Sequence, residues 1–422
     1  MTRLFAVLGC FVSLVFADHQ VKAQAWQVYD MSNTCLESNT VTDIVVQPDG
    51  VAWVATDWGL CRFEDGGCEL FQTSNSGIPD NVLRSLALDD SGRLWVGTST
   101  GGAAVFDGST WEVLNTSNSP LPDDQVNAIH MDDNGWMWLG TVSGLACYTA
   151  AEWRIYDSSP SSYNGRILNG DHILAIDSRS DGLYALGTLN GGFHFLTDTS
   201  VHFFTTFNSG FWDNTQRGVL IDESDNKRWL ACPAGGLVLQ FGDWYGGTFF
   251  QYTAMNSDLP STALVDVAQG ADNSVWLAMQ VAGITHRNAA GNYETYNASN
   301  SGLPSDNVNC ILVAPDGAIW VGLYDGGAAR FDPGMVSVEE APRSGTMRVA
   351  PSVNDGHFRI LGLEGSRMTY WEVLDMTGRV LVSENVVGQG DVWVNLNGPS
   401  PGSYLIRAEV GGKSRIGRFV VH

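Results

Sequence analysis

Basic residues are scarce in this chain. Its 422 residues include 22 Lys and Arg against 46 Asp and Glu, which gives a formal net charge of −24. The imbalance lies before residue 339, because residues 339–422 carry nine basic and nine acidic residues. An acidic surface repels phosphate backbones and anionic lipids, so we expect neither nucleic acid nor a membrane surface as a partner.

Long apolar runs are also missing beyond the N-terminal region, where none approaches the ~20 residues that a membrane-spanning helix needs. Near the N-terminus, an apolar run from Leu4 to Ala17 follows Arg3 and leads to small residues at Ala23 and Ala25. This order is typical of a secretory signal peptide. We therefore assign residues 1–25 as a signal peptide, and we expect a protein without a membrane span that is secreted through the periplasm or held at the cell surface.

Groups that build catalytic or metal sites are few. The histidines form no pair at metal-ligand spacing on one element, and the sequence shows no nucleophile elbow, phosphate loop or recognisable carboxylate pair. The acidic turns at 89–92 and 132–135 are explained by turn geometry rather than by calcium binding. We expect no catalytic residue, no metal and no cofactor, and thus a protein that is not an enzyme.

Six cysteines follow the signal peptide, and disulfides persist in an exported protein. Cys61 and Cys68 flank a Glu-Asp-Gly-Gly turn, which places them on adjacent strands of one hairpin, and Cys35 lies upstream. The sequence predicts a disulfide among these three cysteines and leaves the pairing open.

What the chain does contain is a repeat of 42 to 47 residues, the period of propeller blades. Each unit has a short apolar strand, an Asp/Gly turn, a second strand with an aromatic anchor, and two further strands. The anchors are Trp53, Trp95, Trp138, Tyr184, Trp229, Trp276 and Trp320. Seven anchors predict an all-β, seven-bladed β-propeller.

The two ends of the repeat are incomplete. The sequence after Trp26 matches the fourth strand of a unit, whereas the seventh unit stops after its third strand at Gly334. We therefore expect the N-terminal strand to complete the seventh blade and close the ring, within a propeller domain spanning 26–334.

The second strands and the links of the units have sequences that resemble those of a known repeat family. Second strands such as Leu-Trp-Val-Gly-Thr at 94–98 and links such as Asn-Ser-Gly-Leu-Pro at 300–304 resemble the two-component regulator propeller repeat. That repeat is found in extracellular sensor regions of bacterial hybrid histidine kinases, so the resemblance implies a propeller fold and an association with glycan sensing.

After a linker at 335–343, alternating apolar residues separated by Gly and Asp predict a small β-sandwich over 344–422. Its motifs look like the type A (Por) sorting domain of the type IX secretion system of Bacteroidetes-type bacteria. The residues that carry this resemblance are Gly378, Arg379, Pro401, Gly402 and Tyr404. The resemblance implies the type IX secretion machinery as a partner.

A ligand site is expected on the propeller face built from the links between blades and the turns between second and third strands, because these segments differ from unit to unit. Aromatic and polar side chains mix there, which suits the stacking faces and hydroxyls of a sugar. The ligand-binding candidates are Asp57, Trp58, Tyr163, Asn164, Arg166, Asn190, Phe211, Trp212, Arg217, Gln280, Tyr324 and Asp325.

These observations favour a secreted, monomeric, non-catalytic propeller that binds a glycan or a peptide. Two alternatives stay open. One is a polysaccharide lyase or hydrolase of the propeller type, which would need a histidine or carboxylate cluster at the channel mouth. The other is a protein-interaction scaffold that uses the acidic rim.

Overall fold

The computed structural model describes residues 26–333, except 65, 150, 211, 223–225, 244 and 271, and the C-terminal segments 348–350, 353–354, 357–361, 368–375, 379–388, 392–396, 402–410 and 413–421. The predicted signal peptide, the predicted linker, Phe211, Gly378 and Pro401 lie outside the described residues. The chain divides into two compact units, Met1–Val336 and Ser337–His422. Within the described residues, no helix has the length and apolar character to cross a membrane.

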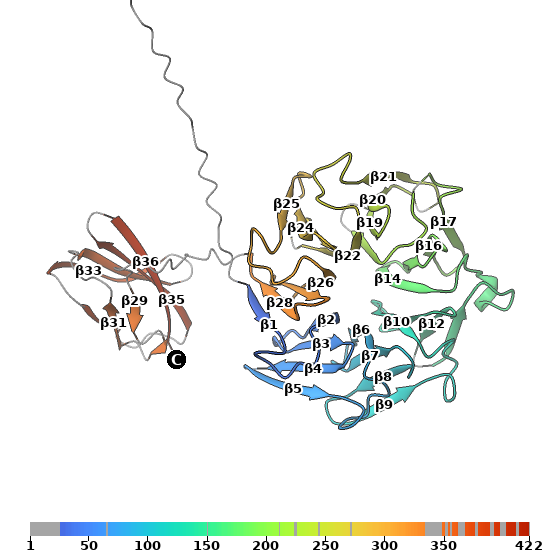
Figure 1. Ribbon diagram of the computed structural model, residues 1–422, viewed down its shortest axis with the longest axis horizontal. Helices are drawn as coiled ribbons and strands as arrows, with labels where there is room; N and C mark the ends of the chain where they lie inside the picture. The colour runs from blue at the N-terminus through green and yellow to red at the C-terminus, as the bar shows by residue number, and fades with distance from the viewer. Residues whose placement is uncertain are drawn as a thin grey trace, which may run out of the picture. The chain divides into compact units, whose positions relative to one another are not determined.

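The described strands of the first unit form seven four-stranded antiparallel sheets arranged in a ring (Figure 1). The first strand of each sheet contacts the first strand of the next sheet around the ring. The all-β propeller class predicted from the repeat is confirmed.

The blades are numbered in chain order. Blades 1 and 2 contain β2 (Val41–Val46), β3 (Ala52–Thr56), β4 (Gly59–Glu64), β5 (Gly67–Phe71), β6 (Leu83–Leu88), β7 (Leu94–Thr98), β8 (Ala103–Phe106) and β9 (Trp111–Leu114). Blades 3 and 4 contain β10 (Val126–Met131), β11 (Met137–Thr141), β12 (Leu145–Tyr148), β13 (Trp153–Tyr156), β14 (Ile173–Arg179), β15 (Leu183–Thr188), β16 (Phe193–Leu196) and β17 (Val201–Phe204). The long link between them holds a short 3-10 helix, η1 (Tyr163–Gly165).

The remaining blades follow the same plan. Blades 5 and 6 contain β18 (Gly218–Asp222), β19 (Lys227–Cys232), β20 (Gly236–Phe241), β21 (Thr248–Tyr252), β22 (Leu264–Gln269), β23 (Val275–Met279), β24 (Gly283–Arg287) and β25 (Tyr293–Tyr296). Blade 7 contains β26 (Val308–Val313), β27 (Ile319–Leu323), β28 (Ala328–Phe331) and β1 (Gln27–Tyr29).

One aromatic residue in each second strand anchors the core. The anchors are 1–4% exposed, and they are Trp53, Trp95, Trp138, Tyr184, Trp229, Trp276 and Trp320. In blade 2, Nε1 of Trp95 donates to Oδ2 of Asp89 at 3.0 Å. In blade 3, Trp138 donates to Oδ2 of Asp132, which also accepts the hydroxyl of Tyr184 from blade 4. Aspartates at the turns thus hold core aromatics in place.

The second strand of each blade lies against the first strand of the next. A Cβ on Gly97 of blade 2 would lie 2.7 Å from the carbonyl oxygen of Val126 in blade 3. A Cβ on Gly322 of blade 7 would lie 2.7 Å from a side-chain carbon of Val41 in blade 1. Glycine in the Val-Gly-Thr pattern therefore permits the close approach of neighbouring sheets.

Carboxylates on first strands also join neighbouring blades. Asp43 of blade 1 accepts the amide of Leu86 in blade 2 at 2.7 Å, and Asp266 of blade 6 accepts the amide of Ile311 in blade 7 at 2.9 Å. Burial raises the pKa of Asp43 to about 7 and that of Asp266 to about 6, because removal from water disfavours the charged form.

The Asn-Ser pair that recurs in the links caps the fourth strand of a blade. After blade 2, Nδ2 of Asn118 donates to the carbonyl of Val113, and its Oδ1 accepts the amide of Asn115. The hydroxyl of Ser119 donates to the carbonyl of Asn115. The same three bonds recur in the links at 75–76, 208–209, 256–257 and 300–301. The repeated Asn-Ser pair therefore stabilises the turn that follows the fourth strand in these blades.

The two ends of the repeat meet in blade 7, where β1 pairs antiparallel with β28. Trp26 packs on Phe331, with ring centroids 5.2 Å apart, and Tyr29 stacks on Trp320, also at 5.2 Å. The first strand of the chain and the last strand of the seventh unit therefore share one sheet and one aromatic cluster.

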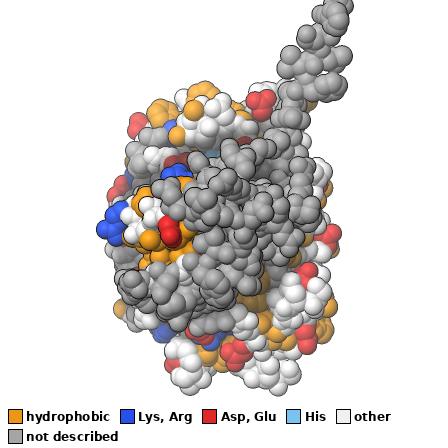
Figure 2. Space-filling model, turned by 90° about the vertical axis from the view of Figure 1, so that its left-hand side faces the viewer, with side chains coloured by type: hydrophobic (Ala, Val, Ile, Leu, Met, Phe, Trp, Pro, Cys, Tyr) orange, Lys and Arg blue, Asp and Glu red, His pale blue; other side chains and the backbone are white. Residues whose placement is uncertain are grey.

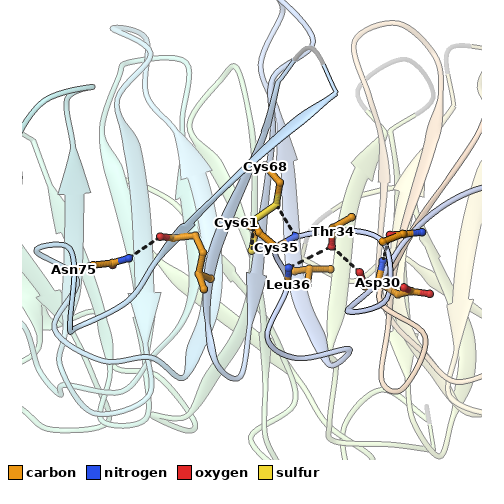
Figure 3. The surroundings of a disulfide bond; sticks show 9 residues. Asp30, Thr34, Cys35, Leu36, Cys61, Cys68 and Asn75 are labelled. Atoms are coloured by element: carbon orange, nitrogen blue, oxygen red, sulfur yellow. Dashed lines mark hydrogen bonds between the residues drawn. A yellow bond between two sulfur atoms is a disulfide. The ribbon is translucent and has the colours of Figure 1, made fainter.

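A disulfide follows this junction and joins Cys35 to Cys68, with Cα atoms 5.7 Å apart (Figure 3). Of the pairings that the sequence left open, this is the one in the structure. It links the segment after β1 to the outermost strand of blade 1. The thiol of Cys61 lies beside it, with its Sγ 3.9 Å from that of Cys35.

In the second unit, the described strands form two sheets. One sheet has the order β29-β31-β34, and the other β30-β36-β35-β32-β33. The strands are β29 (Arg348–Ala350), β30 (Val353–Asn354), β31 (His357–Leu361), β32 (Met368–Asp375), β33 (Val380–Gly388), β34 (Val392–Asn395), β35 (Gly402–Val410) and β36 (Lys413–Val421). Arg379, just before β33, forms an ion pair with Asp375 at the end of β32 at 3.1 Å, and Tyr404 is buried in β35. Gly402 begins β35.

Deletion of residues 24–34 should destabilise the propeller far more than the loss of an ordinary terminal segment, because β1 and its aromatic contacts leave blade 7. We expect a loss of about 3 kcal/mol or more in the free energy of unfolding, measured by guanidinium denaturation. Gln27→Ala, at an exposed position of the same strand, is the control and should change stability by less than about 0.5 kcal/mol. Unchanged unfolding after the deletion would show that the ring does not depend on this strand.

The buried carboxyls predict a pH dependence. Between about pH 4 and 7, the folded protein keeps a proton on Asp43 that the unfolded chain has released, so its contribution to stability falls as pH rises through this window. The loss attributable to Asp43 should be on the order of 3 kcal/mol between pH 4 and pH 8.

Asp43→Asn should flatten this fall, measured as the free energy of unfolding at a series of pH values. Asp258→Asn, which removes an exposed carboxylate from a link, is the matched control and should leave the slope unchanged. Parallel pH curves for the wild type and the Asp43 variant would refute the raised pKa.

Candidate functional site

A cavity of about 840 Å³ occupies the propeller channel. Its wall is formed by the first strands of the blades, and turns between second and third strands contribute part of its mouth. These turns are tied to the links beside them, since the amide of Tyr324 donates to the carbonyl of Asn307 and the amide of Gln280 to that of Ala263. The cavity therefore opens on the face where the sequence predicted a ligand site.

One residue from each blade forms a ring in the cavity wall. In blades 1 to 7 these residues are Thr42, Arg84, Asn127, Leu174, Arg217, Val265 and Asn309. In six blades the residue sits at a register shift between the first and second strands. Blade 5 lacks this shift among its described pairs, and Arg217 directly precedes β18. A bulge frees one side chain from the alternation of the strand and turns it toward the channel.

Some ring residues also serve the fold. Asn127 donates to the carbonyl of Ile173 in blade 4 at 3.1 Å, and Asn309 donates to the carbonyl of Val41 in blade 1 at 2.9 Å. Their amide nitrogens are thus engaged in contacts between blades. The arginines of the ring make no such contact with a neighbouring blade's first strand in the described residues.

Four predicted candidates line the cavity. Asp57, Gln280 and Tyr324 occupy equivalent turn positions in blades 1, 6 and 7, which are neighbours in the ring, and Arg217 belongs to the wall of blade 5. Tyr324 is 56% exposed, so its ring is available at the mouth. The structure therefore brings these four side chains to one hollow.

Other candidates lie in the same turns or links without lining the cavity. Trp58 and Trp212 are exposed by 52% and 65%, and Asp325 is exposed beside Tyr324. The backbone amide of Asn190 donates to Thr215 of the next link. These turn and link residues are not among those that line the cavity.

The predicted candidates in the long link after blade 3, which are Tyr163, Asn164 and Arg166, do not line the cavity. Tyr163 does not face the channel, because its hydroxyl reaches Glu152 at the far end of the outer strand β13. The guanidinium of Arg154 lies 5.4 Å from its ring centroid, and that of Arg166 5.7 Å. Asn164 is exposed within η1. A link of this length folds back on the edge of its own blade, where aromatic and guanidinium groups pack on each other.

Sequence reasoning missed the wall residues on the first strands. Arg84 and Asp266 lie in short, mostly apolar strands, and such a sequence predicts a strand that is buried in the core. The available signal was a polar side chain at the second or third position of five first strands, which are otherwise mostly apolar: β2, β6, β10, β22 and β26.

The charged side chains in the cavity wall differ in how many hydrogen-bond partners they have within the protein. Asp43 also accepts the amide of Ile44, and Asp266 that of Val267, so both oxygens of each carboxyl have backbone partners. Burial lowers the pKa of Arg217, Asp266 raises it, and the charge of Arg84 lowers it again. The carboxyls of Asp43 and Asp266 therefore form hydrogen bonds within the wall, whereas the side chains of Arg84 and Arg217 line the cavity.

The outer surface differs from this wall. On the visible part of the face drawn in Figure 2, the carboxylates in red lie at separate places rather than in one continuous patch. Acidic residues dispersed in this way are typical of a solvated surface.

The cysteine cluster forms no comparable site. The sulfur atoms of Cys35, Cys61 and Cys68 lie within 4.8 Å of one another, but two of them share the disulfide. Burial raises the pKa of the remaining thiol, Cys61, to about 12. A thiol so far from ionisation is a poor nucleophile and a poor metal ligand.

Comparison with known families gives matches within the propeller. The sequence model described as the two-component regulator propeller matches residues 77–100, 120–143 and 302–325. Each match covers a link, the first two strands and the turn beside the channel in blades 2, 3 and 7. No curated protein matches the sequence.

Solved structures share the fold at low identity. The extracellular domain of a protein named as a hybrid two-component system from B. thetaiotaomicron is similar with a TM-score of 0.64 and 18% identity, over 94% of this chain and 57% of that one. PorZ, named as a surface component of the type IX secretion system of Porphyromonas gingivalis, has a TM-score of 0.57 and 17% identity, over 92% and 60%. Virginiamycin B lyase from Staphylococcus aureus has a TM-score of 0.57 and 14% identity, over 73% and 99%.

At such identities the likeness concerns the fold alone, and the chain spans less than two thirds of the length of the first two structures. The ring of four-stranded sheets identifies the first unit as a β-propeller, and three of its segments match the two-component regulator propeller repeat.

Proposed function

We propose that the propeller is an exported, non-catalytic binding protein that takes part of a glycan into the channel cavity. The observation that carries this proposal is the cavity of about 840 Å³ on the link face of the ring. A space of this size is typical of sites that enclose a small ligand or the end of a longer one.

The chemistry of the mouth supports a sugar. Tyr324 offers an exposed aromatic face, against which the apolar face of a sugar ring can stack. Gln280 beside it offers an amide, and Asp57 a carboxylate, which are donors and acceptors for hydroxyl groups. Trp58 and Trp212 add exposed aromatic surface outside the cavity, where a longer chain could extend.

Tyr324→Ala combined with Gln280→Ala should weaken glycan binding at least tenfold without loss of stability, because both side chains are at the mouth and not in the core. Binding is measured with the mature protein by calorimetry, using hits from a glycan and peptide screen. Trp58→Ala with Trp212→Ala is the matched aromatic control and should cost less affinity, because neither residue lines the cavity. An equal or larger loss in this control would move the site from the cavity to the outer turns.

Two further controls separate folding from binding and binding from catalysis. Trp95→Ala should lose roughly 3–5 kcal/mol of stability, since this buried anchor leaves a void. Bound glycan should be recovered unchanged after prolonged incubation. Accumulation of a cleavage or elimination product would overturn the non-catalytic part of the proposal.

We also propose that the unit at Ser337–His422 is a sorting domain for the type IX secretion system. Support comes from the motifs around Arg379 and Tyr404: Arg379 forms an ion pair with Asp375, and Tyr404 is buried in its sheet. The propeller and this unit are separate compact units. A sorting function of the C-terminal unit therefore does not depend on ligand binding by the propeller.

Removal of residues 339–422 should leave a folded propeller that accumulates in the periplasm of its host. The expected result is full-length protein outside the cell and truncated protein in the periplasmic fraction, measured by immunoblot. A full-length protein with Tyr324→Ala is the matched control and should be exported normally. Export of the truncated protein in normal amount would refute the sorting role.

A further inference from the structure

The arginines of the propeller divide into distinct groups. The described residues between 26 and 333 contain ten arginines. Five form ion pairs with carboxylates, and they are Arg62, Arg93, Arg154, Arg179 and Arg330. Three others lie over aromatic rings, and they are Arg166, Arg228 and Arg287. The remaining two, Arg84 and Arg217, both line the channel cavity.

Neither of these two arginines has an ion pair with a carboxylate among the described residues. Nε and Nη2 of Arg84 donate to the hydroxyl of Ser99 at 3.3 and 3.0 Å, which holds the guanidinium at the cavity wall and leaves other donors open. The guanidinium of Arg217 has no protein acceptor within the described part of the chain. Arginine stays charged in proteins, so both groups keep a full positive charge in this hollow.

Their arrangement has an electrostatic consequence. Blades 2 and 5, which carry Arg84 and Arg217, are three blades apart, the largest separation in a ring of seven sheets. The carboxyl of Asp266 raises the pKa of Arg217, and the charge of Arg84 across the cavity lowers it. Two like charges that face one partly desolvated space repel, and an anion between them relieves this repulsion.

The carboxyls nearby offset these charges only in part. Asp266 acts on Arg217, but both oxygens of Asp43 and of Asp266 are already held by backbone amides in the wall. The guanidinium groups of Arg84 and Arg217 therefore present donors that form no ion pair with a carboxylate in the described part of the propeller.

We propose that Arg84 and Arg217 form a subsite for the anionic group of an acidic oligosaccharide, either a uronate carboxylate or a sulfate ester. This inference rests on the proposed glycan binding and adds the ligand's charge to it. Guanidinium groups match the planar, bidentate geometry of carboxylates and sulfate oxygens, and the neutral polar groups at Gln280 and Tyr324 remain for hydroxyls.

The test compares ligands that differ in one group. Uronate oligosaccharides of pectic and alginate type, their methyl esters, a sulfated galactan oligosaccharide and the neutral galactan are titrated against the mature full-length protein. We expect the free uronate or the sulfated form to bind at least tenfold more tightly than its ester or its neutral counterpart, with affinity falling as salt rises.

Variants then assign the effect to the two arginines. Arg84→Gln and Arg217→Gln should each lose about tenfold in affinity for the acidic ligand and less than twofold for the neutral one. Arg93→Gln, on a turn at the opposite end of the strands, is the matched control and should change neither. Thermal unfolding of the three variants shows that each remains folded.

The outcomes are distinguishable. Equal affinity for charged and neutral glycans, or loss of both in the two variants, would overturn the anionic subsite and leave glycan binding standing. Binding of none of these oligosaccharides would overturn the proposed function and the subsite with it. Arginine-dependent binding of an aspartate-rich peptide, with no glycan bound, would replace the glycan by an acidic peptide and overturn the assignment made here.

Discussion

The close approach between the second strand of one blade and the first strand of the next is the constraint on which the rest of this propeller depends. At Gly97 and Gly322 the neighbouring sheet leaves no room for even a methyl group. The aromatic anchors fill the wider spaces between the same sheets, and Trp95 and Trp138 are fixed there by turn aspartates. Spacing between blades is thus set by one small and one large residue in the same short strand.

The close spacing of the blades also positions polar contacts between them at the channel. First strands that lie so close bring backbone amides within reach of side chains from the neighbouring blade, which is how Asp43 and Asp266 obtain their partners. The arrangement buries two carboxyls whose charged forms are disfavoured there. Hydrogen bonds to backbone amides offset part of that cost and give the contact a fixed geometry, since an acceptor must face each amide.

The periodicity of the sequence was enough to predict the architecture, because turns, anchors and links repeat as local patterns. The wall of the cavity was harder to predict. A bulge shifts one residue out of the alternation, and the only sign of that shift in β6 is a polar pair, Arg84 and Ser85, in an otherwise apolar strand. Tyr163 was misplaced for another reason, since a long link can pack along its own blade and its path depends on contacts with Arg154 and Arg166 that lie outside any repeat.

The bulge position explains how a repeated fold acquires a particular site. Most positions in each unit are constrained by the sheet, the core or the links, whereas the ring residue of each first strand lines the channel cavity and differs in chemistry among the blades. Variation there changes the chemistry of the cavity wall. Leu174 and Val265 keep parts of the wall apolar, while Arg84 and Arg217 place charge at two separated blades. The ring residues, which differ from blade to blade, therefore account for part of the difference between the cavity wall and a uniform repeat.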